Sequence, residues 1–307
     1  MKRLLMATLM VAGLAFQAQA DEPTLKPFVL AWKDAADPAA TVTKVTDRLK
    51  AAGFQVVGQY APYPSATVIA VTDDQLKAEA AKTKFGAYGA AERVAVTRVG
   101  AETQVSYTNP RYFAAAYRMA SDLGPTADKL AKALGNAGQF GPDDGLSVDD
   151  LKDYRYMFGM EHFSDPILLA SYKTYAEALA AVEKGLAAHT MGVSKVYRID
   201  MPGKEETVFG VGMNGKGISD DQDDQAIMKE IDFKPLRSTA HLPYDMVVEG
   251  GKVYTLSARF RIAIDFPDLS MMGSNSFMGI MGAPDAIRTA LSHAAGGDWS
   301  TVKGQSN

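Results

Sequence analysis

The chain contains no cysteine among its 307 residues. Disulfides, thiolate metal ligands and thiol nucleophiles are therefore excluded, and so is a lipid-bearing cysteine at a processed N-terminus. Histidine is also scarce, and the four that occur lie far apart in sequence: His162, His189, His241 and His293. Because zinc signatures usually contain closely spaced ligand pairs, this spacing argues against a zinc site.

Sequence motifs for catalysis and for phosphate or calcium binding are missing as well. No Gly-x-Ser-x-Gly step places a serine nucleophile, and the glycine-rich stretch 212–217 lacks the Lys-Ser/Thr pair of a phosphate-binding loop. The acidic run 219–224 lacks the alternating spacing and closing glutamate of an EF-hand. A non-enzymatic protein is therefore the favoured prediction, and an enzyme whose site is assembled from noncontiguous residues stays open as an alternative.

A long apolar run occurs only at the N-terminus. Lys2 and Arg3 precede the apolar stretch 4–16, and the small-residue segment 18–20 follows. This order is typical of a signal peptide cleaved after Ala20, and the stretch is shorter than the ~20 residues that span a membrane. We expect a periplasmic protein without a transmembrane anchor. Its net charge, −4 for the whole chain, becomes more negative when the two N-terminal cations are removed, which disfavours nucleic acid as a partner.

What the sequence does contain is an internal repeat. Residues 27–33, Pro-Phe-Val-Leu-Ala-Trp-Lys, recur at 166–172 as Pro-Ile-Leu-Leu-Ala-Ser-Tyr, and the Gly-x-x-x-Val step at 53–57 recurs at 192–196. Both pairs are offset by 139 residues. Because self-similarity at a fixed offset indicates a duplicated structural unit, we predict two related domains packed as an internal pseudo-dimer.

The apolar periodicity of each copy predicts one element order: strand, helix, two strands, helix, two strands, helix. Each domain is thus expected to be an α+β unit, a curved antiparallel sheet with helices packed on it. The predicted ranges are 1–20 for the signal peptide, 22–135 for the first domain, 136–159 for a linker, 160–298 for the second domain and 299–307 for a tail. Copy two carries predicted insertions at 214–221 and 259–282, because the closing helices at Pro125 and Pro284 are 159 residues apart.

Two short motifs in the first copy give it a resemblance to a known family. The first predicted helix ends in Gly53-Phe54-Gln55-Val56, and the hairpin ends in Val105-Ser106-Tyr107-Thr108-Asn109-Pro110. Over about residues 26–135 the chain thereby resembles the "domain of unknown function 302" family. The resemblance implies an α+β domain similar to the TATA-box-binding-protein-like folds, often assembled as dimers, and it implies no established reaction. Copy two departs from the family at Phe266-Pro267, where the tyrosine step is not recognisable.

Aromatic and basic side chains cluster at the end of the first copy's hairpin. The candidate ligand-binding residues in this cluster are Tyr107, Arg111, Tyr112, Tyr117 and Arg118. An aromatic patch with two cations suits an anionic or aromatic ligand. The alternative is that these rings seal the sheet against the second domain.

Methionine is grouped in two places that suggest a metal site. The candidate ligands are Met157, Met160 and His162 near the linker, and Met271, Met272, Met278 and Met281 in the glycine-rich insertion of copy two. Thioethers hold copper(I) in exported proteins, where thiols would oxidise. The alternative is that these methionines fill irregular gaps in cores and at adaptable interfaces.

These patterns together predict an exported, non-enzymatic binding or accessory protein. Its ligand, a small molecule or a protein, is expected at the junction of the two domains, and no cofactor is expected. The alternatives are a periplasmic copper(I)-handling protein that uses the methionine clusters and an enzyme with a noncontiguous site.

Overall fold

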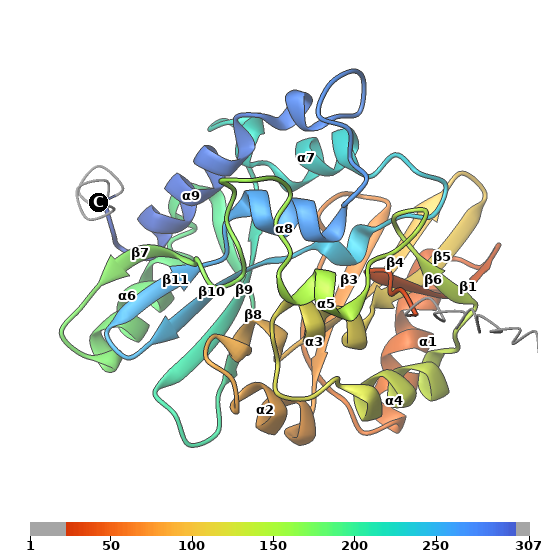
Figure 1. Cartoon of the computed structure of the whole chain (residues 1–307), viewed down its shortest axis with the longest axis horizontal. Coiled ribbons are helices and arrows are strands. Elements are labelled where there is room, and N and C mark those ends of the chain that lie inside the picture. The colour runs from red at the N-terminus through yellow and green to blue at the C-terminus, as the bar shows by residue number, and fades with distance from the viewer. Residues whose placement is uncertain (1–22, 299–307) are drawn as a thin grey trace, which may run out of the picture.

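The computed structural model describes residues 23–298 of the chain. The predicted signal peptide and the predicted tail lie outside these residues. Within them the chain forms two antiparallel sheets, of six and five strands, together with nine α-helices (Figure 1). The α+β class is therefore confirmed, and the two separate sheets are consistent with two domains. None of the described helices has the length and apolar character needed to cross a membrane.

The first sheet and its helices come from the N-terminal half of the chain. In chain order its elements are β1 (Phe28–Asp34), α1 (Pro38–Ala51), β2 (Gln55–Tyr60), β3 (Ala66–Thr72), α2 (Asp74–Ala80), β4 (Glu92–Val99), β5 (Glu102–Thr108), α3 (Pro110–Ala116), α4 (Gly124–Leu134) and β6 (Gly138–Phe140). The short helix α5 (Val148–Lys152) follows in the connection to the second half.

The second sheet and its helices come from the C-terminal half. In chain order its elements are β7 (Ile167–Ser171), α6 (Tyr175–Ala187), β8 (Val193–Asp200), β9 (Glu206–Met213), α7 (Asp224–Ile231), β10 (Tyr244–Glu249), β11 (Lys252–Thr255), α8 (Ala258–Asp265) and α9 (Ala283–Ala294). This order repeats that of the first half from β1 to α4.

Both sheets have the same strand arrangement. The first runs β2-β3-β4-β5-β1, with β6 added at the β1 edge, and the second runs β8-β9-β10-β11-β7. Even a local irregularity repeats, because the register shifts at Val57 between β2 and β3 and at Val196 between β8 and β9. These two bulge residues are 139 positions apart, which is the offset of the sequence repeat.

The first helix of each half is held by the same devices. A side-chain cap starts each one, from Asp37 for α1 and Thr174 for α6. Residues at a spacing of four then form the buried face: Thr41, Val45 and Leu49 in α1, and Ala178, Val182 and Leu186 in α6. Each buried stripe packs on one face of its own sheet, together with α4 in the first half and α9 in the second.

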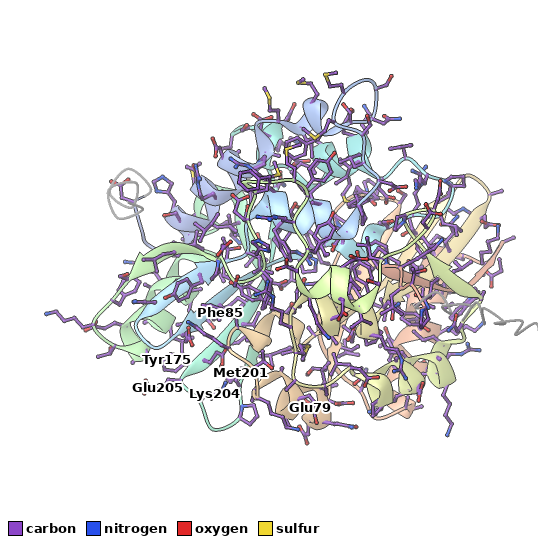
Figure 2. The ribbon with its side chains drawn as sticks, in the orientation of Figure 1. Glu79, Phe85, Tyr175, Met201, Lys204 and Glu205 are labelled. Atoms are coloured by element: carbon purple, nitrogen blue, oxygen red, sulfur yellow. The ribbon has the colours of Figure 1, made fainter. Side chains whose placement is uncertain are left out.

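The opposite faces of the two sheets point toward each other and share a core. This interface core contains Tyr112 and Tyr117 from the first half and Tyr197 and Phe260 from the second. The ring of Phe85, between α2 and β4, lies 5.3 Å from that of Tyr254 in the second half (Figure 2). The helices α1 and α4 therefore lie at one end of the molecule and α6 and α9 at the other (Figure 1).

The bulged strands β2 and β8 meet directly at this junction. At Gly58, a Cβ atom would lie 2.2 Å from the carbonyl oxygen of Val196. No side chain fits there, so glycine is what allows the two edge strands to approach. The junction is consequently a close backbone contact as well as a layer of side chains.

The stretch 259–282, predicted as one insertion, is partly an element of the repeat. Its first part is α8, which follows β11 as α3 follows β5, and Ser257 precedes it as Asn109 precedes α3. Thr255 pairs with Met246 in the second sheet as Tyr107 pairs with Val94 in the first. The register therefore places Thr255 at the position that Tyr107 has in the first half, before the helix, whereas Phe266-Pro267 lies beyond the end of α8.

Candidate functional site

A buried ion pair joins the two sheets at the junction. Arg93 of β4 pairs with Asp245 of β10, and each side chain is only 2% exposed. The hydroxyl of Tyr197 donates to the other oxygen of Asp245 at 2.5 Å. Burial opposes the charge of Arg93, but attraction to Asp245 raises the pKa of its guanidinium above the ordinary value. Arg93 is therefore charged although the pair is almost completely removed from solvent.

A second buried group of polar residues lies beside this pair. His241 shares a hydrogen bond of 2.5 Å between its Nδ1 and Asp265 Oδ2. Arg261 donates to the Tyr117 hydroxyl at 2.6 Å and to the carbonyl of His241 at 2.7 Å. Burial lowers the pKa of His241 in spite of the neighbouring Asp265. The His–Asp pair resembles a catalytic dyad, but the imidazole of His241 is 0% exposed and has no contact with solvent.

The five candidate residues of the aromatic cluster divide into an interior and a surface group. The hydroxyls of Tyr107 and Tyr112 donate to the carbonyls of Gly135 and Ile264, at 3.0 and 2.7 Å. Tyr117 is buried against Arg261, so two of the three rings contact the second half.

The two arginines of this cluster lie on the surface and line a separate groove of ≈ 410 Å³. Arg111 pairs with Asp122, and Arg118 donates to the carbonyl of Lys152 at 2.6 Å. The rings and the cations thus do not converge on one site.

The methionine clusters partly converge. Met160 and Met271, one from each cluster, line the same narrow apolar pocket with Tyr156 and Phe277. Sulfur atoms gather at the end of the molecule that carries α7 (Figures 1 and 2). The remaining methionines are exposed: Met157 47%, Met272 70%, Met278 52% and Met281 65%.

The imidazole of the first cluster faces an aspartate instead of the methionine pocket. His162 Nδ1 lies 3.8 Å from Asp153 Oδ1. In residues 23–298 no three His, Asp or Glu side chains are grouped so that they could hold a metal ion. Any metal at the methionine pocket would therefore depend on thioether sulfur.

An open cleft of ≈ 460 Å³ lies at the junction of the two halves. The first half contributes the turn 63–65 between β2 and β3 and the end of β4, residues 97–100. The second half contributes Gln225, Met228 and Lys229 of α7, and then Asp232 and Arg237 from the segment that follows. Three segments that are far apart in the sequence, 63–65, 97–100 and 225–237, thus build one cavity between the two halves.

Three cations line this cleft: Arg98, Lys229 and Arg237. None of them forms an ion pair with a carboxylate in the part of the chain that the structure describes. Arg98 is held by bonds to the carbonyl of Gly100 at 2.9 Å and to the hydroxyl of Thr103 at 3.1 Å. Arg237 donates to the main-chain carbonyl of Asp232. Arg98 and Arg237 are therefore positioned by hydrogen bonds to uncharged oxygen atoms.

Asp232 is the acidic residue of the cleft, and it is 6% exposed. Burial raises its pKa to about 7, although the N–H of Ser238 and the charge of Arg237 act in the opposite direction. Burial likewise raises the pKa of Tyr63 to about 12, so its hydroxyl is neutral at physiological pH. Near neutrality the cleft thus presents three cations, the neutral hydroxyl of Tyr63 and the carboxyl group of Asp232, whose pKa is raised.

This arrangement can attract and hold a small anion. Guanidinium and ammonium groups donate charge-assisted hydrogen bonds to carboxylate and phosphate oxygens, and a concave wall concentrates their field.

Comparison with known proteins found no matching family model, no matching curated protein and no matching solved structure.

Sequence reasoning did not identify these residues. Arg98 ends a strand, Lys229 lies on a helix, and Arg237 lies in a loop, so no short motif contains two of them. The available signal was the basic segment Lys234-Pro-Leu-Arg237 between a predicted helix and a predicted strand. A ligand at the junction of the two domains stays a prediction. The cleft lies at this junction.

Proposed function

We propose that the protein binds a small anionic ligand in the cleft between its two halves. The observation that carries this proposal is the set of three cations, without carboxylate partners among the described residues, around a cavity of ≈ 460 Å³. Sites for small molecules are usually clefts of about 300–1,000 Å³ with a few converging polar groups, and they often lie between domains. An exported binding or accessory protein is the role that fits such a site.

The ligand class follows from the donors. Two guanidinium groups suit planar, bidentate contacts with carboxylate or phosphate oxygens, and Lys229 adds a mobile point charge. The hydroxyl of Tyr63, neutral because its pKa is raised to about 12, adds a further donor. A ligand with one or two carboxylate or phosphate groups satisfies all of these donors.

We also propose that the two halves are related copies of one domain. The shared strand order and the shared bulge position support two copies of one α+β domain, packed as an internal pseudo-dimer of the TATA-box-binding-protein-like kind. Kinship with the domain of unknown function 302 family rests on the two short motifs of the first copy. In this arrangement the cleft is a product of the duplication, because both copies contribute to it.

Copper(I) handling is a second candidate function, favoured by the meeting of Met160 and Met271 in one pocket. Thioether ligands are selective for copper(I). The doubly substituted Met160→Leu/Met271→Leu protein keeps the apolar volume, so it tests the ligands and not the packing. Loss of copper(I) binding in a competition titration with a chelator supports the idea, and unchanged binding rules it out.

The anion proposal is tested by calorimetric titration of the mature protein with orthophosphate and with succinate. Lys229→Ala and Arg237→Ala should each weaken binding by about threefold to tenfold, because each removes one charged donor. Lys252→Ala is the matched control, since Lys252 is an exposed lysine on the distant β10–β11 turn. Equal affinities in all four proteins, or no binding of either anion by the folded protein, would contradict the proposal.

A further inference from the structure

The cleft between the two halves is larger than an inorganic anion requires. Its volume is ≈ 460 Å³. Since a water molecule takes up about 30 Å³ of liquid volume, the atoms of orthophosphate would fill only about a third of this space. The rest of the cleft has room for a molecular body that is attached to the anionic group.

The wall around that remaining space is partly apolar. The apolar side chains that line it come from both halves: Tyr63, Pro64, Val99 and Met228. Val99 directly follows the cation Arg98 in the chain, and both line the cleft. Met228 directly precedes Lys229 in the same way. A ligand whose anionic group is held by these cations therefore places the rest of its structure against apolar side chains.

The ring of Tyr63 belongs to the first half and is held in place by the second. It packs against the hydrophobic core of the second half. Its hydroxyl lies 3.1 Å from that of Thr239, which also accepts a hydrogen bond of 2.9 Å from Thr97. A side chain that is already fixed loses little conformational freedom when a ligand contacts it. The ring is thus a preformed part of the wall.

An aromatic ring is the body that this set of side chains favours. Aromatic rings stack on tyrosine, and thioether sulfur makes favourable contacts with ring edges. Guanidinium groups stack on ring faces in addition to pairing with anionic oxygens. The cleft contains all three kinds of group, in Tyr63, Met228, Arg98 and Arg237. An alkyl body would gain only from the burial of apolar surface.

We propose that the ligand of the cleft carries its anionic group on an aromatic ring, as aryl carboxylates and aryl phosphates do. Arg98, Lys229 and Arg237 contact the oxygen atoms of the anionic group, and the ring lies against the apolar part of the wall. This inference rests on the proposed function and narrows its ligand class.

The experiment is a calorimetric titration of the mature protein with pairs of ligands that differ only in the body. Phenyl phosphate should bind about tenfold more tightly than methyl phosphate at pH 8, where both are dianions, because about half of one ring leaves water. Benzoate should exceed acetate by a similar factor, and cyclohexanecarboxylate should exceed acetate by only about threefold. Comparison of phenyl phosphate with benzoate shows which anionic group the cleft takes.

The same titrations separate this inference from the proposed anion site. If orthophosphate and methyl phosphate bind but the phenyl ligands bind no more tightly, the anion site stands and the aromatic ligand class is wrong. Cyclohexanecarboxylate that binds as tightly as benzoate would also overturn the aromatic ligand class. If no anion binds to the folded protein, or if phenol binds as tightly as phenyl phosphate, both proposals are wrong.

Two variants of Tyr63 form a matched pair. Tyr63→Leu removes the ring, whereas Tyr63→Phe removes only the hydroxyl group. The preference for phenyl phosphate over methyl phosphate should fall from about tenfold to about threefold or less in Tyr63→Leu, and it should stay near tenfold in Tyr63→Phe. Melting curves check that both variants fold, and the ligand series on the unaltered protein decides if Tyr63→Leu does not. An unchanged preference in folded Tyr63→Leu would overturn the inference.

Discussion

The two halves of the molecule have the same strand order and yet differ in key residues where they touch. Arg93 pairs with Ala70 in the first sheet, and Asp245 pairs with Gly210 in the second. Because Ala70 and Gly210 lie at matching positions of β3 and β9, Arg93 and Asp245 lie at matching positions of β4 and β10. These two residues face each other across the junction and form its buried ion pair. Two identical copies would bring like charges together at this point, so sequence divergence between the halves is what makes their close packing possible.

A second pair of residues at matching positions differs in side-chain size instead of charge. Gly58 and Tyr197 follow the equivalent bulges in β2 and β8. Glycine in the first half admits the backbone of β8, while the ring of Tyr197 in the second half lies over Gly210 and its hydroxyl reaches Asp245. One half therefore provides space and the other fills it. A pair of identical subunits could not divide these roles.

The largest expected effect comes from breaking the matched charge pair. Asp245→Asn leaves Arg93 buried without its counter-charge and should lower the free energy of unfolding by about 3–5 kcal/mol. The exchanged protein Arg93→Asp/Asp245→Arg restores opposite charges across the junction and should recover part of that loss. Urea unfolding of the two variants measures both values. If the exchanged protein has no higher free energy of unfolding than Asp245→Asn, opposite charge at these two positions is not what stabilises the junction.

The second largest effect is expected from filling the space at Gly58, beside the bulge of β2. Gly58→Ala places a Cβ atom against the carbonyl of Val196 and should destabilise the protein by about 2–4 kcal/mol, since a backbone atom must move. Gly100→Ala is the comparison, because no atom lies within 4 Å of its Cβ position and only its positive φ of 59° opposes alanine. That variant should lose about 1 kcal/mol. Equal losses in urea unfolding would argue against a close backbone contact between β2 and β8.

A third prediction uses pH to separate the halves. The first half buries Glu92 where the second half has Tyr244, and burial raises the pKa of Glu92 to about 8. The folded state thus keeps a proton that the unfolded chain releases above its ordinary pKa of 4.5. Stability from this group is complete below that value and is lost as the pH rises through about 8.

The variant that tests this prediction is Glu92→Gln, which removes the titration. Its free energy of unfolding should match that of the unaltered protein near pH 5 and exceed it at pH 9, with a difference on the order of a few kcal/mol. Tyr244→Phe, at the matching position, should show no such divergence below pH 9, because burial raises the pKa of that hydroxyl well above 10. Parallel stability curves for Glu92→Gln and the unaltered protein would contradict the assignment.

The smallest expected effect compares the caps of the first helices. The side chain of Asp37 accepts from the N–H of Ala40 at 2.9 Å, and Thr174 accepts from that of Glu177 at 3.2 Å. Alanine at either position should cost about 1 kcal/mol, because each cap satisfies one free N–H group. Thermal melting of the two variants should give similar shifts. A large shift for one cap alone would mean that the two helices are not equivalent.

The order of elements in the two halves was largely predictable because its signals are local. The repeats at 27–33 and 53–57 and the apolar periodicity of each copy are local patterns, and they predicted every element of the repeated order except α3 and α8. The α8 helix was missed because its apolar face is interrupted by Arg259 and Arg261, and Arg261 is buried only through partners in other segments.

The candidate site was not predictable in the same way. Arg98, Lys229 and Arg237 come together only when the two sheets pack, and the raised pKa of Asp232 is a consequence of that burial. The aromatic residues that the sequence suggested are used for the junction instead, as Tyr112 and Tyr117 show. Sequence patterns report what an element buries, but not which residues of distant elements meet at a cleft.

The most direct test of the central claim, an anion site between the halves, is an NMR titration of the ¹⁵N-labelled mature protein with orthophosphate. The largest amide shifts should fall in 97–100, in 225–229 and at Arg237, which surround the cleft. They should disappear in Lys229→Ala/Arg237→Ala and persist in Lys252→Ala. Shifts centred on the separate groove of Arg111 and Arg118, or no shifts at all, would contradict the account.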